Sequence, residues 1–217
     1  MITYYYNVHT HSPSLHSDEV SILNRIIRGK KEEKEKSKEK TGFLSAGIHP
    51  WYIEDVAVQM KQLRDVATLP EVVAIGEAGL DRLTDTPIDI QQDIFARQAH
   101  LAEALQKPFI IHCVKAWEEL MAVKKQIKPK TAWIIHGFRG KPDMAEQLVH
   151  QDFHLSFGAH FNPGSLPIAY PNHILTETDD KDCSIQMVYR QIASALHITE
   201  EVLGKQIQKN VKSLFPI

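Results

Sequence analysis

The chain has 217 residues, which suits a single domain with a substantial core, and we expect one domain over residues 1–217. Its 25 Lys and Arg against 27 Asp and Glu give a formal charge of −2, which excludes the strongly basic surface of proteins that adhere to nucleic acid or anionic membranes. No targeting pattern opens the chain and no apolar run approaches the roughly 20 residues of a membrane span. The sequence therefore predicts a cytoplasmic protein with no membrane contact, and Cys113 and Cys183 are expected as reduced thiols.

Short apolar runs rich in β-formers alternate with helical patterns along the chain. Strands are predicted at 2–9, 20–27, 42–49, 72–79, 108–113, 131–137, 153–158 and 173–179, and helices at 54–67, 88–106, 116–126, 142–151 and 184–214, the last in one or two pieces. This alternation predicts an α/β fold, a (β/α)8 TIM-type barrel, distorted because helices are missing after strands 1 and 2. An open doubly wound sheet is the alternative, although no GxGxxG or GxxxxGK[ST] motif follows any strand.

A charged stretch, "KKEEKEKSKEK", covers residues 30–40, between the second and third predicted strands. It interleaves Lys and Glu with no apolar residue, so it has nothing to bury against a core. We expect a solvated loop or a loose surface helix. The alternative is that its lysines meet a polyanionic substrate.

Ionisable side chains stand at the carboxyl ends of several predicted strands. His9 and His11 are two residues apart, a spacing that places both imidazoles on one face of a strand, about 6–7 Å apart. Four more residues occupy equivalent strand ends: Glu77, His112, His136 and Asp179. In a parallel barrel these ends meet at one mouth, where catalytic residues are drawn from several strands.

Each of these residues alone also has an ordinary structural interpretation. A single His after a strand is more often a hydrogen-bonded rim residue than a ligand, and Glu77 alone is consistent with a helix cap. The joint pattern favours a metal site, because a structural account must explain six ionisable groups at equivalent positions independently. The other histidines, including His49, lack that shared position, and most of them are expected to be ordinary surface or loop residues.

The motifs "NVHTH", "AGIHPW", "AIGEAGLD", "PFIIHC", "WIIHGF", "ILTETD" and "NVKSLF", in this order, resemble the TatD family of metal-dependent deoxyribonucleases, within the amidohydrolase-like superfamily. The resemblance spans nearly the whole chain. It implies that His9, His11, Glu77 and Asp179 hold one divalent ion. It also implies that Glu77 bridges to a second ion held by His112 and His136.

Two divalent ions suit phosphodiester hydrolysis. Ions about 3.5–4 Å apart acidify a water and brace the attacking and leaving oxygens in line. Asp179 and Glu77 are the expected catalytic carboxylates, Asp179 as acceptor of the proton from the attacking water. Imidazole-rich ligation favours Zn, Mn, Fe or Ni over Mg, while the resemblance implies Mg or Zn, so the cofactors are predicted as two divalent ions, with Mg, Zn and Mn as the candidates.

The chain departs from the family pattern at two places. Asn7 stands where most relatives have Asp before the two histidines, which removes a negative charge beside the predicted ligands. Asp180 and Lys181 follow "ETD" where Ala-Pro is usual, which changes the rim that meets the substrate.

Three residues near the predicted mouth are candidates for substrate binding. Lys115 and Arg139 begin loops after the fifth and sixth strands, where they can neutralise phosphate oxygens. Trp51 either stacks on a base or packs over the barrel edge.

The leading prediction is therefore a metal-dependent phosphodiesterase acting on DNA or oligonucleotides, with no obligate protein partner. The alternatives are a hydrolase of a small ester, amide or phosphate, and a protein that keeps the fold with little turnover.

Overall fold

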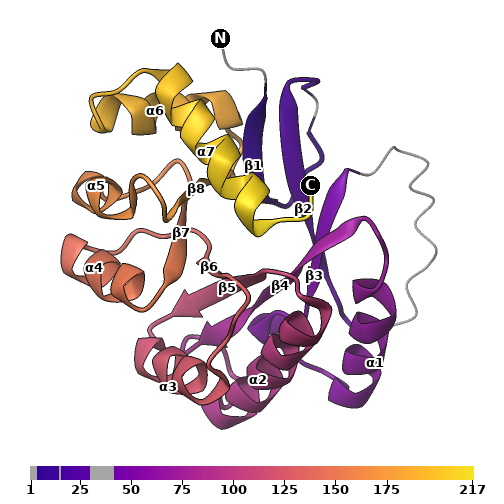
Figure 1. The fold of residues 1–217 in the computed structure, drawn as a ribbon. Coiled ribbons are helices and arrows are strands. Elements are labelled where there is room, and N and C mark those ends of the chain that lie inside the picture. Colours follow the sequence, from indigo (N-terminus) through magenta and orange to yellow (C-terminus); the bar gives the residue numbers. More distant parts are fainter. Residues whose placement is uncertain (1–3, 15, 30–41) are drawn as a thin grey trace. The chain divides into compact units, whose positions relative to one another are not determined.

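The computed structural model describes residues 4–14, 16–29 and 42–217 (Figure 1). Its eight strands follow one another in chain order in one sheet, and every strand pair whose register is described is parallel. This order, with helices between the strands, is that of a TIM-type (β/α)8 barrel, as predicted. The chain divides into two compact units, which we call the terminal unit (Met1–Leu23 with Ala132–Ile217) and the central unit (Asn24–Thr131).

The strands are β1 (Tyr5–Thr10), β2 (Glu19–Ile26), β3 (Phe43–Gly47), β4 (Val72–Asp81), β5 (Phe109–Val114), β6 (Trp133–Ile135), β7 (Phe153–Phe157) and β8 (Ile174–Thr176). The helices are α1 (Val56–Ala67), α2 (Ile88–Leu105), α3 (Trp117–Ile127), α4 (Pro142–His150), α5 (Leu166–Ala169), α6 (Ile185–Ala195) and α7 (Glu200–Leu214), with 3-10 turns η1 (Pro50–Tyr52) and η2 (Pro163–Ser165). Within the described ranges, no helix has the length and apolar character needed to cross a bilayer.

In the terminal unit, the first and the last strand of the sheet lie side by side. β7 is parallel to β6 and β8, and β1 is parallel to the start of β2. β8 is followed by a parallel bridge between Asp179 and Thr10, the last residue of β1. Pairing of the first strand with the last is the feature that closes a barrel sheet.

The last two helices anchor this strand pair through buried polar contacts. From α6, the hydroxyl of the fully buried Tyr189 accepts the backbone N–H of Tyr6 in β1 at 2.9 Å. From α7, the side-chain amide of Asn210 donates to the carbonyls of Pro171 and Ile174, at 2.8 and 2.9 Å. These bonds fix β1 and β8, whose ends carry several of the predicted site residues.

The central unit is built around β4, whose ten residues are all buried. β3 and β5 lie on either side of it, which explains the nearly continuous apolar sequence of this strand. Helix α2 packs on the sheet through Phe95, whose ring centroid is 5.0 Å from that of Phe109. The side-chain amide of Gln98 bonds both the N–H and the carbonyl of Ile48, just after β3.

Gly79 allows the close approach of β4 to β5. A Cβ at this position would lie 1.9 Å from the carbonyl oxygen of His112, its partner in the register. Any other residue would force the strands apart. This glycine therefore sets where His112 stands relative to the end of β4.

Most predicted elements agree with the structure to within a few residues. β6 and β8 are shorter than expected, three residues each, because the polar residues that follow them leave the strand to form the site. The short helix α5 and both 3-10 turns were not predicted, since they are too short to show a period. No helix separates β1 from β2 in the residues described there. The charged stretch 30–40 and the predicted missing helix after strand 2 involve residues outside the described ranges, and the single domain stays a prediction.

Candidate metal centre

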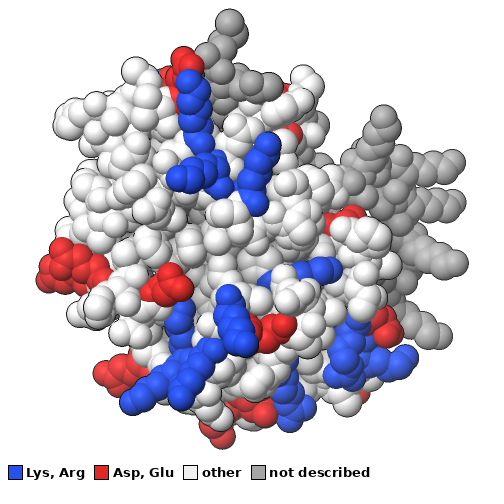
Figure 2. All heavy atoms as spheres, in the orientation of Figure 1, with Lys and Arg blue, Asp and Glu red and all other residues white. Residues whose placement is uncertain are grey.

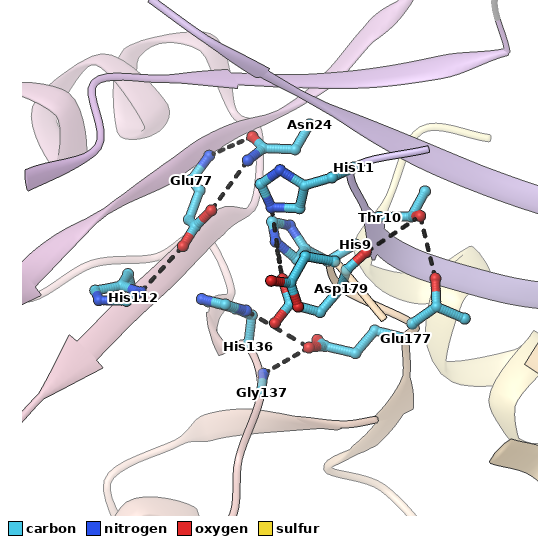
Figure 3. Close-up of polar contacts among 12 residues, drawn as sticks. His9, Thr10, His11, Asn24, Glu77, His112, His136, Gly137, Glu177 and Asp179 are labelled. Atoms are coloured by element: carbon cyan, nitrogen blue, oxygen red, sulfur yellow. Dashed lines mark hydrogen bonds and ion pairs between the residues drawn. The ribbon is translucent and has the colours of Figure 1, made fainter. Parts of the chain in front are cut away.

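In the terminal unit, His9 and His11 direct their imidazoles toward one carboxylate (Figure 3). Nε2 of each ring lies 3.5 Å from Oδ1 of Asp179. The two ring centroids are 5.2 Å apart, as a spacing of two along a strand requires. His9 is fully buried, while about one third of the His11 side chain is exposed.

His136, the residue after β6, belongs to the same group. Its ring centroid is 4.4 Å from that of His9. One ligand atom from each of His9, His136 and Asp179 lies within 4.8 Å of the others. Two imidazoles and a carboxylate at this separation fit the requirements of a divalent metal ion.

Asp179 is held by backbone contacts in an uncommon conformation. Its φ of 56° is left-handed, a region that Asp tolerates better than most residues. Its N–H donates to the carbonyl of His9 at 3.0 Å, and its carbonyl accepts the N–H of His11 at 3.1 Å. The end of β1 therefore fixes the backbone from which the Asp179 carboxylate projects.

Glu177 is a site residue that was not predicted. It is fully buried, and its Oε1 accepts the backbone N–H of Gly137 at 2.7 Å and lies 3.5 Å from Nδ1 of His136 (Figure 3). The carboxylate lies against Nδ1 of the His136 ring and orients the ring, in the way that buried carboxylates orient metal-binding histidines. Its signal in the sequence was the first position of "ETD", directly after the short strand β8.

In the central unit, Glu77 on β4 is the centre of a second group. Its Oε1 lies 3.0 Å from Nδ1 of His112 and 3.1 Å from Nε2 of His49, and its Oε2 accepts a hydrogen bond from the Asn24 amide at 3.0 Å. Ligand atoms of His49, Glu77 and His112 lie within 4.8 Å of one another. This donor set also fits a divalent metal ion, because a buried carboxylate and two imidazoles converge on one point.

The expectation for His49 was wrong. Its side chain is buried against Glu77 instead of lying on the surface, and its Nδ1 accepts the N–H of Trp51 at 3.1 Å. It stands two residues after β3, at the strand end that corresponds to those of the predicted ligands. The signal that pointed to it was its place as the last residue of the predicted strand 42–49.

Asp81, the last residue of β4, orients His112 from the other side. Its Oδ2 lies 3.2 Å from Nε2 of His112 and accepts the indole N–H of Trp51 at 2.6 Å. Burial alone would raise the pKa of Asp81, but hydrogen bonds from Trp51, Leu83 and His112 outweigh it and lower that pKa. With an ion bound beside Glu77, the ionised Asp81 would accept a hydrogen bond from the Nε2–H of His112, and Nδ1 would keep its lone pair for the ion.

The three predicted substrate contacts have different settings. Arg139 is exposed and lines a small cavity with Asp179, Gly137, His160 and Lys181 in the terminal unit. Lys115 directly follows β5, exposed and in a left-handed conformation. Trp51 is 57% exposed although its indole N–H is bound to Asp81, so it is not packed into a core.

Comparison with known proteins gives consistent matches. The family model described as "TatD related DNase" matches residues 19–216. The chain is 29% identical over 198 residues to the "uncharacterized metal-dependent hydrolase YabD" of Bacillus subtilis, covering 81% of this chain and 78% of that protein. It is 28% identical over 200 residues to the "3'-5' ssDNA/RNA exonuclease TatD" of Pantoea vagans, covering 79% and 76%. The crystal structure of the TatD homolog YjjV from Escherichia coli matches over 100% of both chains, with a TM-score of 0.82 at 20% identity.

Proposed function

Because the chain belongs to the TatD-related DNase family of metal-dependent hydrolases, we propose that it hydrolyses phosphodiester bonds of single-stranded DNA or short oligonucleotides. One observation carries this proposal: each unit gathers two imidazoles and a carboxylate within 4.8 Å. These groups are His9, His136 and Asp179 in the terminal unit and His49, Glu77 and His112 in the central unit.

The proposal includes two divalent ions for each chain. His9, His136 and Asp179, with His11 beside Asp179, would hold one ion, and His49, Glu77 and His112 the other. Bound there, the ions supply an acidified water and stabilise the charge that develops on the phosphate. The imidazole share of the donors favours Zn or Mn over Mg.

The chain's own side chains have distinct parts in this reaction. Asp179, whose side chain is 19% exposed, accepts the proton of the attacking water. Arg139 and Lys115 pair with oxygens of the phosphates that neighbour the phosphodiester bond being hydrolysed. The exposed ring of Trp51 stacks on a base, while its N–H stays on Asp81.

Contact with the phosphate backbone is local in this proposal. On the face drawn in Figure 2, Lys and Arg occur in separate groups with Asp and Glu between them. The net charge of −2 agrees with this pattern. We therefore expect oligonucleotide hydrolysis to weaken with rising salt along a shallow slope, because only about one to three protein cations displace counterions.

The test compares kcat/KM for a short single-stranded oligonucleotide with that for a small uncharged ester, across a salt series. Lys115→Ala/Arg139→Ala should raise the KM for the oligonucleotide and flatten the salt slope, with little effect on any ester hydrolysis. Lys61→Ala/Arg64→Ala, which removes two exposed cations from α1, is the matched control and should behave as wild type. If neither salt nor Lys115→Ala/Arg139→Ala changes the ratio of the two kcat/KM values, the result would favour a small-molecule hydrolase. Metal binding without turnover of either substrate would favour a protein that keeps the fold without catalysis.

A further inference from the structure

Asn7 is a buried amide on β1, two residues before His9, and every polar atom of its side chain has a partner in the terminal unit. It is 2% exposed. Its Nδ2 donates to Oε1 of Glu19 at 2.8 Å and to Oγ1 of Thr178 at 2.9 Å, and its Oδ1 accepts the backbone N–H of Thr178 at 3.1 Å. The orientation of the amide is unambiguous, because a backbone N–H only donates and a carboxylate only accepts.

Two of these hydrogen bonds hold Thr178, one at its backbone N–H and one at its hydroxyl. Thr178 stands between Glu177 and Asp179 in "ETD", so it links the two carboxylate residues near the candidate metal site of the terminal unit. The Thr178 hydroxyl in turn donates to Oγ1 of Thr10 at 3.1 Å, next to the bridge between Thr10 and Asp179. The side chain of Asn7 thus fixes the position of Thr178, and with it the backbone that leads into Asp179.

Glu19 fixes the amide from the other side. While its Oε1 accepts from Asn7, its Oε2 accepts the hydroxyl of Ser14 at 2.8 Å. Its carboxylate needs donors on both oxygens, and the neutral amide supplies one. A carboxylate at position 7 would put two negative groups at hydrogen-bond distance and would remove both Nδ2 bonds.

We propose that Asn7 is a positioning residue for Asp179, and that its pairing with Glu19 is what makes an amide the required side chain there. The inference rests on the proposed metal-dependent function and names a residue through which that site is set. The hydrogen bonds of the Asn7 side chain go to Glu19 and Thr178, and not to His9, His136 or Asp179. Asn7 fixes the position of Thr178, and the position of Thr178 sets the direction of the Asp179 carboxylate.

The experiment measures Mn²⁺ affinity by calorimetry, with thermal unfolding alongside, for wild type, Asn7→Asp, Glu19→Gln and Asn7→Asp/Glu19→Gln. Asn7→Asp should weaken Mn²⁺ binding by about 10-fold or more, because both Nδ2 hydrogen bonds are lost and the new carboxylate repels Glu19, which displaces Thr178 and with it Asp179. Glu19→Gln alone should stay within about three-fold of wild type, since its amide oxygen still accepts from Asn7. The double variant should also return to within about three-fold, because the new Gln donates to the new carboxylate.

Gln59→Glu is the matched control, since Gln59 is also a buried amide that donates to two acceptors, the carbonyls of Ile27 and Tyr52. It should lower the melting temperature and leave Mn²⁺ affinity unchanged. The proposal is overturned if Asn7→Asp binds Mn²⁺ as wild type does, if the double variant does not recover, or if Gln59→Glu loses affinity equally. Wild type that binds no Mn²⁺ contradicts the metal site and this proposal together, whereas wild type that binds Mn²⁺ but cuts no oligonucleotide contradicts the nuclease activity alone.

Discussion

Glu77 and Glu177 are both buried carboxylates, yet their surroundings give them different tasks. Glu77 faces His49 and His112 with one oxygen, where a cation would be shared between them. Glu177 accepts a backbone N–H from Gly137 and lies against His136, so its position is fixed by the main chain. The first is placed to compensate positive charge directly, and the second to orient a ligand.

Glu77→Gln keeps the shape of the side chain and removes its charge. Because this charge would compensate the dication held with His49 and His112, we expect turnover of an oligonucleotide to fall by at least about 100-fold while the fold is retained. Steady-state kinetics with circular dichroism measures both. Glu146→Gln on the exposed face of α4 should leave turnover unchanged. Full activity of Glu77→Gln with metal bound would show that Glu77 does not serve the ions.

The predicted site residues lie in or just after the expected strands, and their roles as ligands stay predictions. β4 and β5 continue beyond Glu77 and His112, to Asp81 and Val114, so these two residues do not end their strands as predicted. His112 and His136 directly follow or end apolar runs, so their position was visible without a structure. Glu177 was overlooked beside Asp179, because which of two neighbouring acids faces His136 depends on the left-handed turn at Asp179. His49 was overlooked because its partner, Glu77, is remote in sequence and its burial depends on packing rather than on pattern.

At the scale of elements, Glu103 ties α2 to the segment that leads to β6. Its carboxylate accepts the N–H of Lys130 at 3.0 Å, the N–H of Thr131 at 2.8 Å and the hydroxyl of Thr131. Burial alone would raise the pKa of Glu103, but these hydrogen bonds and the charge of Lys130 outweigh it and lower that pKa.

A lowered pKa in the folded state makes this contribution depend on pH. The carboxylate stabilises the fold at pH values above its unfolded pKa of about 4.3, and the contribution disappears as pH falls through the lower folded pKa. Glu103→Gln should therefore cost about 1–2 kcal/mol of unfolding free energy at pH 7 and progressively less toward pH 3. Urea unfolding at both pH values measures this, with the exposed Glu118→Gln as control. A cost that is equal at both pH values would contradict the account.

The elements themselves were predictable where apolar periodicity is long. α2 and β4 were placed to within two residues of their observed bounds, since 18 and 10 residues carry a clear pattern. α5 has four residues and follows a 3-10 turn, so its existence depends on Asn162, whose side chain accepts the N–H of Gly164, and on the prolines around it. Such turn chemistry decides structure locally without leaving a period.

At the scale of the whole molecule, the two groups predict that metal binding and stability are linked. Loading with Mn²⁺ should give up to two ions per chain by elemental analysis. At about 100 times the dissociation constant, one site adds about 2.7 kcal/mol, which raises the melting temperature by roughly 5–10 °C over the chelated protein. His9→Ala/His11→Ala should bind fewer ions and show a smaller shift, whereas the exposed pair His100→Ala/His150→Ala should match wild type. Equal metal content in wild type and His9→Ala/His11→Ala would show that the ligand assignment is wrong.

The pairing of the first strand with the last also determines when the site can exist during synthesis. Asn7 and Thr178, which bond each other beside the metal-binding group, are 171 positions apart. At about 5–20 residues per second, a ribosome adds the second roughly 10–30 s after the first. Throughout that interval His9 has no Asp179 to face, and α7, which holds β8 through Asn210, is still unmade. We therefore expect the proposed hydrolytic activity to appear only after Thr178 and α7 have been synthesised.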